Sequence, residues 1–95
     1  MDFNKVLAFV DRWVQLGLKR VVLCPGSRCA PLTLACVRHP ALRCYSIPDE
    51  RSAAFIALGM AEASSEPVAL VCTSGTASLN FYPAIAEAYY RHVGL

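Results

Sequence analysis

Residues 44–55 read Cys-Tyr-Ser-Ile-Pro-Asp-Glu-Arg-Ser-Ala-Ala-Phe, an apolar stretch followed by a charged turn and an alanine-rich segment. The apolar run is typical of a buried strand, proline and aspartate favour a turn, and alanine favours a helix. The stretch therefore predicts a strand that passes through a short loop into a helix. Glu50 lies at this junction, where a carboxylate is partly desolvated and its protonation can be tuned for proton transfer. Glu50 is our candidate catalytic residue.

The same unit of strand, loop and helix precedes this stretch. Residues 21–24 form a continuous apolar run, and the Pro-Gly-Ser-Arg loop at 25–28 follows them. Pro31 suits the first turn of a helix, and Pro40 requires that helix to end before it. Further upstream, apolar residues recur at three- and four-residue steps over 3–16, which predicts an amphipathic helix.

A third unit follows the stretch. Residues 68–72 lead through the Thr-Ser-Gly-Thr loop at 73–76 to a predicted helix over 77–92, and we expect Pro83 to kink this helix or delay its start. Another strand is expected where the sequence ends. Three units in a row predict one α/β domain over 1–95, with three layers in which helices cover both faces of a parallel sheet.

The composition argues against a nucleic-acid-binding, a membrane-spanning or a disulfide-rich protein. The chain has 95 residues and a net charge of +2, and it has no basic run that could follow a nucleic-acid backbone, so nucleic acid is not an expected partner. No apolar run reaches the roughly 18 residues of a membrane span, and no signal-peptide pattern is present. Five cysteines without a C-x-x-C pair predict buried reduced thiols, in place of a disulfide framework or a zinc site. We therefore expect a cytoplasmic protein without an integral membrane segment.

The loops of the three units are expected to meet in space. In open parallel sheets, ligands bind beyond the carboxyl ends of the strands, and all three loops follow such ends. The first loop offers Gly26 for close backbone approach, the Ser27 hydroxyl, and the Arg28 guanidinium, which can bind a carboxylate or phosphate with two hydrogen bonds. Taken alone, this loop is equally well interpreted as an ordinary turn with a solvated arginine.

The other two loops also allow a structural interpretation. The 73–76 loop can hold an anion or a polar ring at a helix start, or it can simply cap the helix. It is neither the G-x-G-x-x-G fingerprint nor the G-x-x-x-x-G-K-[ST] phosphate loop. In the central loop Asp49 can cap the helix, and Arg51 points to a different side from Glu50. The helix dipole alone would also explain an acid at Glu50.

Taken together, these segments resemble one family. The segments are Cys-Pro-Gly-Ser-Arg at 24–28, Ala-Pro-Leu-Thr at 30–33, the ten residues from Ser46 to Phe55, and Cys-Thr-Ser-Gly-Thr-Ala at 72–77 with Asn80, Pro83 and Ala84 beyond it. In order and spacing they are similar to the thiamine-diphosphate enzymes, in particular to the menaquinone-pathway synthases that join the succinyl unit of 2-oxoglutarate to isochorismate. The Asp-Glu-Arg-Ser stretch is the specific part, because the Thr-Ser-Gly loop occurs widely among thiamine-diphosphate enzymes.

The resemblance implies a fold and a role for Glu50. It implies that the chain is the N-terminal part of a pyrimidine-binding domain, with three parallel strands in the spatial order two, one, three. Glu50 matches the cofactor-activating glutamate, whose carboxyl hydrogen-bonds a ring nitrogen of the aminopyrimidine of thiamine diphosphate. The aminopyrimidine then takes the proton from the thiazolium carbon, and this carbon attacks the 2-oxo acid. A glutamate held in apolar surroundings suits this role, because desolvation favours its neutral form.

The resemblance also implies binding residues. The implied cofactor-binding residues are Pro25, Gly26, Glu50, Gly75 and Thr76. Ser27 and Arg28 match residues near the substrate, where an arginine suits the carboxylates of 2-oxoglutarate or isochorismate.

Two departures from the family pattern limit what the chain can do alone. Cys29 stands where the family usually has a small hydroxyl residue, and if that hydroxyl positions substrate, the affinity for substrate changes. No Gly-Asp-Gly segment for magnesium and the diphosphate is present, so no metal ligand is predicted here and Mg²⁺ is expected on a domain outside this chain. We expect the 95 residues alone to be inactive, and the whole enzyme to be a homodimer or a higher homo-oligomer.

Two alternatives remain open from the sequence. One is a different thiamine-diphosphate enzyme, such as another 2-oxo acid decarboxylase or an acetolactate-type synthase. The other is a truncated domain that serves as an interaction module without catalysis.

Overall fold

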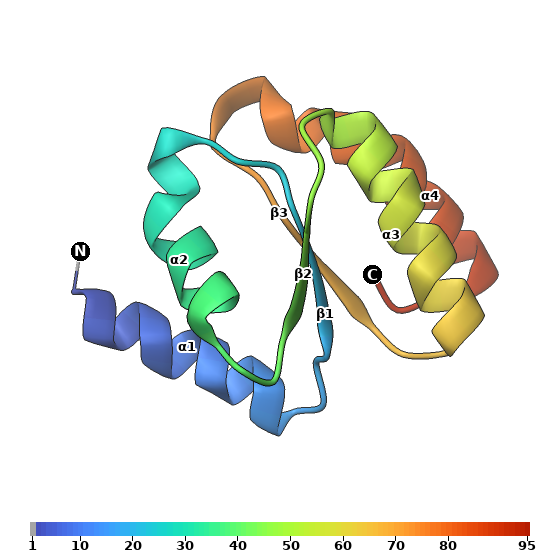
Figure 1. Ribbon diagram of the computed structural model, residues 1–95. Helices are drawn as coiled ribbons and strands as arrows, with labels where there is room; N and C mark the ends of the chain where they lie inside the picture. The colour runs from blue at the N-terminus through green and yellow to red at the C-terminus, as the bar shows by residue number, and fades with distance from the viewer. Residues whose placement is uncertain (1) are drawn as a thin grey trace.

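The computed structural model describes residues 2–95 and has the predicted α/β architecture (Figure 1). In chain order the elements are α1 (Phe3–Gln15), β1 (Arg20–Leu23), the 3₁₀ helix η1 (Ser27–Cys29), α2 (Ala30–Arg38), β2 (Arg43–Ser46), α3 (Glu50–Ser64), β3 (Val68–Val71), the 3₁₀ helix η2 (Gly75–Phe81) and α4 (Tyr82–Arg91).

The three strands form one parallel sheet in the order β2-β1-β3. β1 is the central strand, and its last residue, Leu23, is in register with Ser46 of β2 and with Val71 of β3. Parallel strands need a crossover connection: α2 connects β1 to its neighbour β2, and α3 carries the chain from β2 to β3 on the other side of β1. The expected strand order two, one, three is confirmed.

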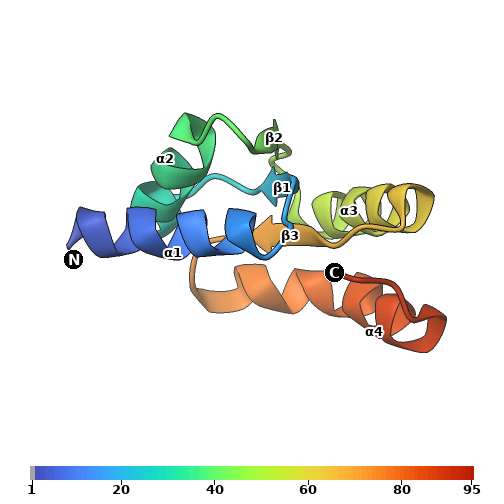
Figure 2. The same cartoon turned by 90° about the horizontal axis from the view of Figure 1, so that it is seen from below.

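Helices cover both faces of the sheet, which confirms the three layers (Figures 1 and 2). β1 divides the core because its side chains alternate between the faces. Val21 and Leu23 join a cluster with residues of α1 and α2, whereas Val22 and Cys24 join a cluster with residues of α3 and α4. The second cluster includes four alanines of α3, whose small side chains let that helix lie close to the sheet: Ala53, Ala54, Ala57 and Ala61.

The helix ends follow from local sequence. The Asp2 side chain accepts a hydrogen bond from the Asn4 backbone N–H (2.9 Å) and caps α1. Pro31 lies in the first turn of α2, where its missing N–H is not needed, and the helix ends at Arg38 before Pro40. These boundaries agree with the sequence prediction.

Strand ends and the last helix differ from the prediction. Each strand ends one residue earlier than the predicted apolar run, so that β1, β2 and β3 end at Leu23, Ser46 and Val71. The predicted helix over 77–92 is a 3₁₀ helix up to Phe81 and an α-helix from Tyr82 onward. Pro83, which cannot donate a backbone hydrogen bond, lies in the first turn of α4 and so fixes where the α-helix can begin. The expected delay in the helical start is confirmed.

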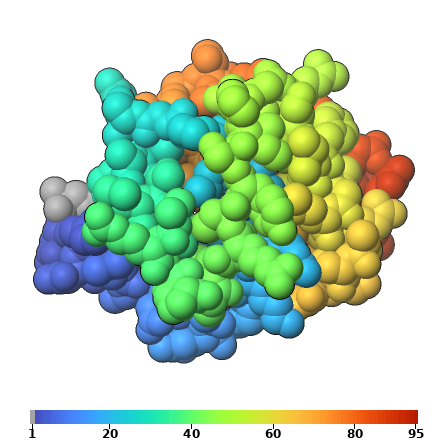
Figure 3. Space-filling model, viewed as in Figure 1, coloured from blue at the N-terminus to red at the C-terminus, as the bar shows by residue number. Residues whose placement is uncertain are grey.

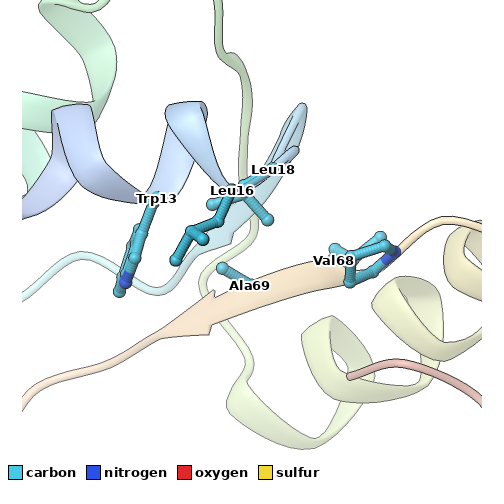
Figure 4. A pocket seen from close by; sticks show the side chains of 6 residues that line it. Trp13, Leu16, Leu18, Val68 and Ala69 are labelled. Atoms are coloured by element: carbon cyan, nitrogen blue, oxygen red, sulfur yellow. The ribbon is translucent and has the colours of Figure 1, made fainter.

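The outer edge of β3 is partly covered. At its start the Val68 amide donates to the Gly94 carbonyl (3.1 Å), so the segment after α4 lies beside β3. Near the same amino end of the sheet, an apolar groove of about 210 Å³ lies between the end of α1 and the start of β3 (Figure 4). The groove is lined by Trp13, Leu16, Leu18, Pro67, Val68 and Ala69. Within residues 2–95, no helix has the length and apolar character to cross a membrane.

Candidate functional site at the carboxyl edge of the sheet

The three predicted loops begin at the same level of the sheet. The ladder continues one residue beyond β1 and β2, since the Cys24 amide donates to the Val71 carbonyl (2.8 Å) and the Ile47 amide donates to the Leu23 carbonyl (2.9 Å). The loops therefore leave the sheet side by side, and in the space-filling view their cyan, light-green and orange segments meet along one edge of the molecule (Figure 3). The expected convergence of the three loops is confirmed.

The central loop places Glu50 at the first residue of α3. Asp49 caps this helix, because its carboxylate accepts a hydrogen bond from the Ser52 backbone N–H (2.9 Å). That hydrogen bond lowers the pKa of Asp49 below its usual range. With the cap supplied by Asp49, the neighbouring Glu50 carboxylate is not needed for capping, and within residues 2–95 it forms no ion pair.

Glu50 is half-buried and lies near the ends of the other two strands. Burial raises the pKa of the Cys24 thiol to about 11, and the negative charge of Glu50 adds to this shift. Burial also raises the pKa of Cys72, with further contributions from Cys29 and then from Glu50. The carboxylate of the central loop therefore acts on residues that follow β1 and β3. The apolar surroundings expected for Glu50 itself stay a prediction.

The first and third loops are in direct contact. A Cβ atom on Gly26 would lie 2.6 Å from the Cβ of Thr73, a distance that real Cβ atoms essentially never show. The requirement for glycine comes from the lack of space beside Thr73. It does not come from the backbone conformation, because an extended backbone (φ −169°) is accessible to any residue. A second link joins the same loops, because Nη1 of Arg28 donates to Oγ of Ser74 (3.1 Å). The interpretation of this loop as an ordinary turn with a solvated arginine therefore describes only part of the structure. Arg28 is exposed to solvent, but its guanidinium is also hydrogen-bonded to the neighbouring loop.

Cys29 faces the interior of its own loop. Its side chain is 7% exposed, and its single S–H has two acceptors within reach, the Gly26 carbonyl at 3.3 Å and the Cys24 carbonyl at 3.7 Å. The Thr33 hydroxyl donates to the sulfur in turn (3.7 Å). The thiol thus ties the 25–28 loop to the start of α2. This position supports the loop, and the suggestion that a hydroxyl here would position substrate stays a prediction.

The third loop leads into the 3₁₀ helix η2, and the α-helix begins only at Tyr82, in agreement with the delay expected from Pro83. Gly75 adopts the left-handed region (φ +81°), which glycine enters without steric cost, and its carbonyl accepts a hydrogen bond from Ser78 Oγ (3.4 Å). The Asn80 side chain donates to the Thr76 carbonyl (3.0 Å). Gly75 and Thr76 are exposed at the loop surface, on the same edge as Pro25 and Ser27, which are also exposed.

Comparison with known proteins agrees with this arrangement. Residues 4–95 match the family described as thiamine pyrophosphate enzyme, N-terminal TPP binding domain; thiamine pyrophosphate is the same molecule as thiamine diphosphate. The chain belongs to this thiamine pyrophosphate enzyme family. The resemblance inferred from the loops is thereby confirmed.

Relatives of the family with closely similar sequences share one name. The chain is 57% identical over 88 residues to 2-succinyl-5-enolpyruvyl-6-hydroxy-3-cyclohexene-1-carboxylate synthase of Geobacillus kaustophilus, a match that covers 93% of this chain and 15% of that protein. Proteins of the same name match at 58% over 79 residues in Flavobacterium psychrophilum (83% of this chain and 14% of that protein) and at 57% over 86 residues in Synechococcus elongatus (90% and 14%). The chain thus spans about one seventh of the length of these thiamine pyrophosphate enzymes.

Sequence reasoning placed Pro25, Gly26, Ser27, Arg28, Glu50, Gly75 and Thr76 at one edge of the sheet, and the structure brings them to that edge. It did not identify Ser74 as the partner of Arg28, or Cys29 as the support of the first loop. Both contacts depend on where a side chain points, and the pattern of apolar and polar residues in the sequence does not predict this. The apolar groove beside Trp13 lies at the opposite end of the strands and is separate from this edge. Within residues 2–95, no group of three or more His, Cys, Asp and Glu side chains is arranged to hold a metal ion.

Proposed function

We propose that this chain is the N-terminal part of the pyrimidine-binding domain of a 2-succinyl-5-enolpyruvyl-6-hydroxy-3-cyclohexene-1-carboxylate synthase. The whole enzyme would be a transferase of menaquinone biosynthesis, which decarboxylates 2-oxoglutarate with the help of thiamine diphosphate and transfers the succinyl unit to isochorismate. The observation that carries this proposal is the position of Glu50 on α3, half-buried at the edge where three loops meet, in a chain 57% identical to a synthase of that name.

The residues at this edge fit an aminopyrimidine ring. Glu50 offers a carboxyl group without an ion-pair partner among residues 2–95, so it is free to hydrogen-bond a ring nitrogen. Gly75 leaves open space, since a Cβ there would meet no atom within 4 Å. Gly26 lets the first loop lie directly against Thr73 of the third loop, so the two loops form one continuous surface. Pro25 and Thr76 border this surface.

Thiamine diphosphate, when bound, supplies a nucleophilic carbon that adds to the 2-oxo acid and accepts the electrons left by carbon dioxide. Glu50 would hold a proton between its carboxyl oxygen and a nitrogen of the aminopyrimidine ring. The glutamate side chain carries this carboxyl one methylene farther from the backbone than aspartate, which allows it to reach a ring outside the strand end. Asp49 keeps the start of α3 fixed through the Ser52 hydrogen bond and so fixes the backbone from which Glu50 extends.

Substrate recognition is proposed for Ser27 and Arg28. Both side chains are exposed in the short η1 helix, and Arg28 carries a guanidinium whose paired N–H groups match a carboxylate. The carboxylates of 2-oxoglutarate and of isochorismate are suitable partners. We further propose that the enzyme is a cytoplasmic homodimer, and that Mg²⁺ and the diphosphate are bound by a domain outside this chain.

The substitution Glu50→Gln in the full-length enzyme tests the proposal. Glutamine keeps the size of the side chain but cannot hold the proton, so hydrogen–deuterium exchange at the reactive carbon of bound thiamine diphosphate should slow by about 100-fold or more. The exchange is measured by acid quench and NMR. Glu62→Gln is the matched control, since Glu62 lies on the same helix and pairs with Arg91 far from the loops. Its exchange rate should equal that of the wild type.

Unchanged exchange in Glu50→Gln would refute the assigned role of Glu50. Consumption of 2-oxoglutarate and pyruvate by the wild-type enzyme is compared in the same experiments. A preference for pyruvate would refute the proposed substrate and favour an acetolactate-type synthase instead.

A further inference from the structure

Ser74 lies next to Gly75, on the edge of the sheet that also carries Arg28. It precedes Gly75 in the third loop, is exposed, and has an extended backbone (φ −75°, ψ 176°). Its hydroxyl oxygen accepts the hydrogen bond from Nη1 of Arg28 across the two loops (3.1 Å). Because 46 positions separate the two residues in the sequence, only the fold brings them together.

The backbones on both sides of this hydrogen bond are fixed independently of it. On one side, the Cys29 thiol holds the loop of Arg28 through the Gly26 carbonyl (3.3 Å). Between the loops, Gly26 packs directly against Thr73, the residue before Ser74. The position of the Ser74 hydroxyl is therefore fixed by the loop backbone. The hydrogen bond to this hydroxyl restricts the Arg28 side chain more than it restricts the loops.

An exposed arginine samples many rotamers, and a ligand that needs one of them must select it at a cost in entropy. The bond to Ser74 restricts the guanidinium before any ligand arrives. It uses one of five N–H donors, which leaves enough donors to bind a carboxylate through two parallel hydrogen bonds.

We propose that Ser74 is a positioning residue that orients the Arg28 guanidinium for the carboxylate of the substrate. This inference rests on the proposed function, because it takes Arg28 as a substrate-binding residue. Ser74 itself touches no reacting atom in this proposal, and its effect passes through Arg28.

The test uses four variants of the full-length enzyme: Ser74→Ala, Ser74→Thr, Arg28→Ala and the double variant Ser74→Ala with Arg28→Ala. KM is measured for 2-oxoglutarate and for isochorismate together with kcat, and the affinity for thiamine diphosphate is measured separately by calorimetry. Ser74→Ala should raise the KM of the same substrate that Arg28→Ala affects, by about fivefold to tenfold, with kcat and cofactor affinity within about twofold of wild type.

Two comparisons separate positioning from a merely structural role. Ser74→Thr keeps the hydroxyl and should restore KM to within about twofold of the wild type. In the Arg28→Ala background, removing the Ser74 hydroxyl should change KM by less than about twofold, because a residue that acts only through Arg28 has nothing left to orient. Ser78→Ala is the control, since among residues 2–95 that hydroxyl donates only to the Gly75 carbonyl of the same 3₁₀ helix.

Failure of this inference differs from failure of the proposed function. Two results would refute the positioning role and leave the proposed function intact, provided that the wild-type enzyme converts 2-oxoglutarate and isochorismate. One is that Ser74→Ala leaves both KM values unchanged, and the other is that Ser74→Ala raises KM by the same factor in the Arg28→Ala variant. If Ser74→Ala weakens cofactor binding and not substrate binding, the role is also refuted. A wild-type enzyme that does not convert these substrates would overturn the proposed function and the inference with it.

Discussion

At the scale of single residues, Gly26 shows how a close approach between loops builds the candidate site. The position demands a small residue because Thr73 occupies the space that a side chain would need. Two links across the same gap, the Gly26–Thr73 packing and the Arg28–Ser74 hydrogen bond, make the first and third loops one surface. A change at Gly26 should therefore affect both loops.

Replacement of Gly26 by alanine is predicted to destabilise the protein. The new Cβ would lie 2.6 Å from Thr73, so the loops must move apart, and overpacking of this kind costs about 1–3 kcal/mol in the free energy of unfolding. Urea unfolding followed by circular dichroism measures the change. Cofactor affinity should fall in the same variant, since the loop surface is opened.

Gly59→Ala is the matched control for this substitution. Gly59 lies inside α3, and a Cβ there would meet no atom within 4 Å. Alanine favours a helix over glycine, so this variant should be more stable than wild type by about 0.5–1 kcal/mol. Equal effects of the two substitutions would contradict the spatial requirement at Gly26.

At the scale of secondary-structure elements, α3 is the helix on which the site depends, and its start is held by a titrating group. Asp49 has a lowered pKa because the Ser52 N–H donates to its carboxylate in the folded state. A carboxyl group whose folded-state pKa is below its unfolded value stabilises the fold above the unfolded pKa, which is about 3.9 for aspartate. That contribution is lost as the pH falls through the lowered, folded-state pKa.

Replacement of Asp49 by asparagine should therefore flatten the acid limb of the stability curve. Asparagine is also a good N-cap but does not titrate, so the variant should keep the helix start while its unfolding midpoint declines less steeply as the pH falls from about 5 through the lowered, folded-state pKa of Asp49. Thermal unfolding of both proteins across this range measures the difference. Asp49→Ala, which removes the cap, should lower the midpoint by a few degrees at neutral pH. Parallel pH curves for wild type and Asp49→Asn would refute the linkage.

The elements also show which parts of the structure the sequence can predict. The three repeated units predicted the parallel sheet and its helices, and Pro31, Pro40 and Pro83 located helix boundaries because proline acts through its own backbone. The strand order β2-β1-β3 came only with the family resemblance, and the structure agrees with it. The 3₁₀ helix after Gly75 was missed, since short apolar and polar residues there are compatible with either helix type.

The sequence predicted which loops form the candidate site, but it did not predict the side-chain contacts between them. That three loops share one edge follows from parallel connectivity alone. The Arg28–Ser74 hydrogen bond and the inward thiol of Cys29 depend on rotamers and on distances between loops, which the sequence pattern does not specify. The role of Glu50 rests on family resemblance, and its physical surroundings alone left a helix-dipole explanation open.

At the scale of the whole molecule, a large apolar surface is exposed. The C-terminal helical segment exposes three tyrosines and a leucine, since Tyr82, Tyr89 and Tyr90 are 69%, 75% and 78% exposed and Leu79 is 68% exposed. This segment lies beside α3, on the same side of the sheet and at the periphery of the molecule (Figure 2). Surfaces of this kind are typical of contacts with other proteins or domains.

The isolated 95-residue chain is therefore predicted to self-associate. Its weight-average mass in sedimentation equilibrium should rise with concentration, because association removes the aromatic surface from water. Tyr89→Lys with Tyr90→Lys should reduce this rise. Asn4→Lys with Ala8→Lys adds the same charge to exposed positions of α1 and should have a smaller effect. A monomer at all concentrations would contradict the prediction.

The central position of β1 also has a consequence for the order in which the chain folds during translation. One face of β1 packs on a cluster to which, among residues 2–95, those after β2 contribute only Ala69 and Val71 of β3. The other face waits for α3 and the segments that follow it. As the ribosome releases the chain, the first face can be buried while Val22 and Cys24 on the second face are still open to water. We expect the nascent chain to be most prone to misassociation in that interval, which ends only when α3 has emerged.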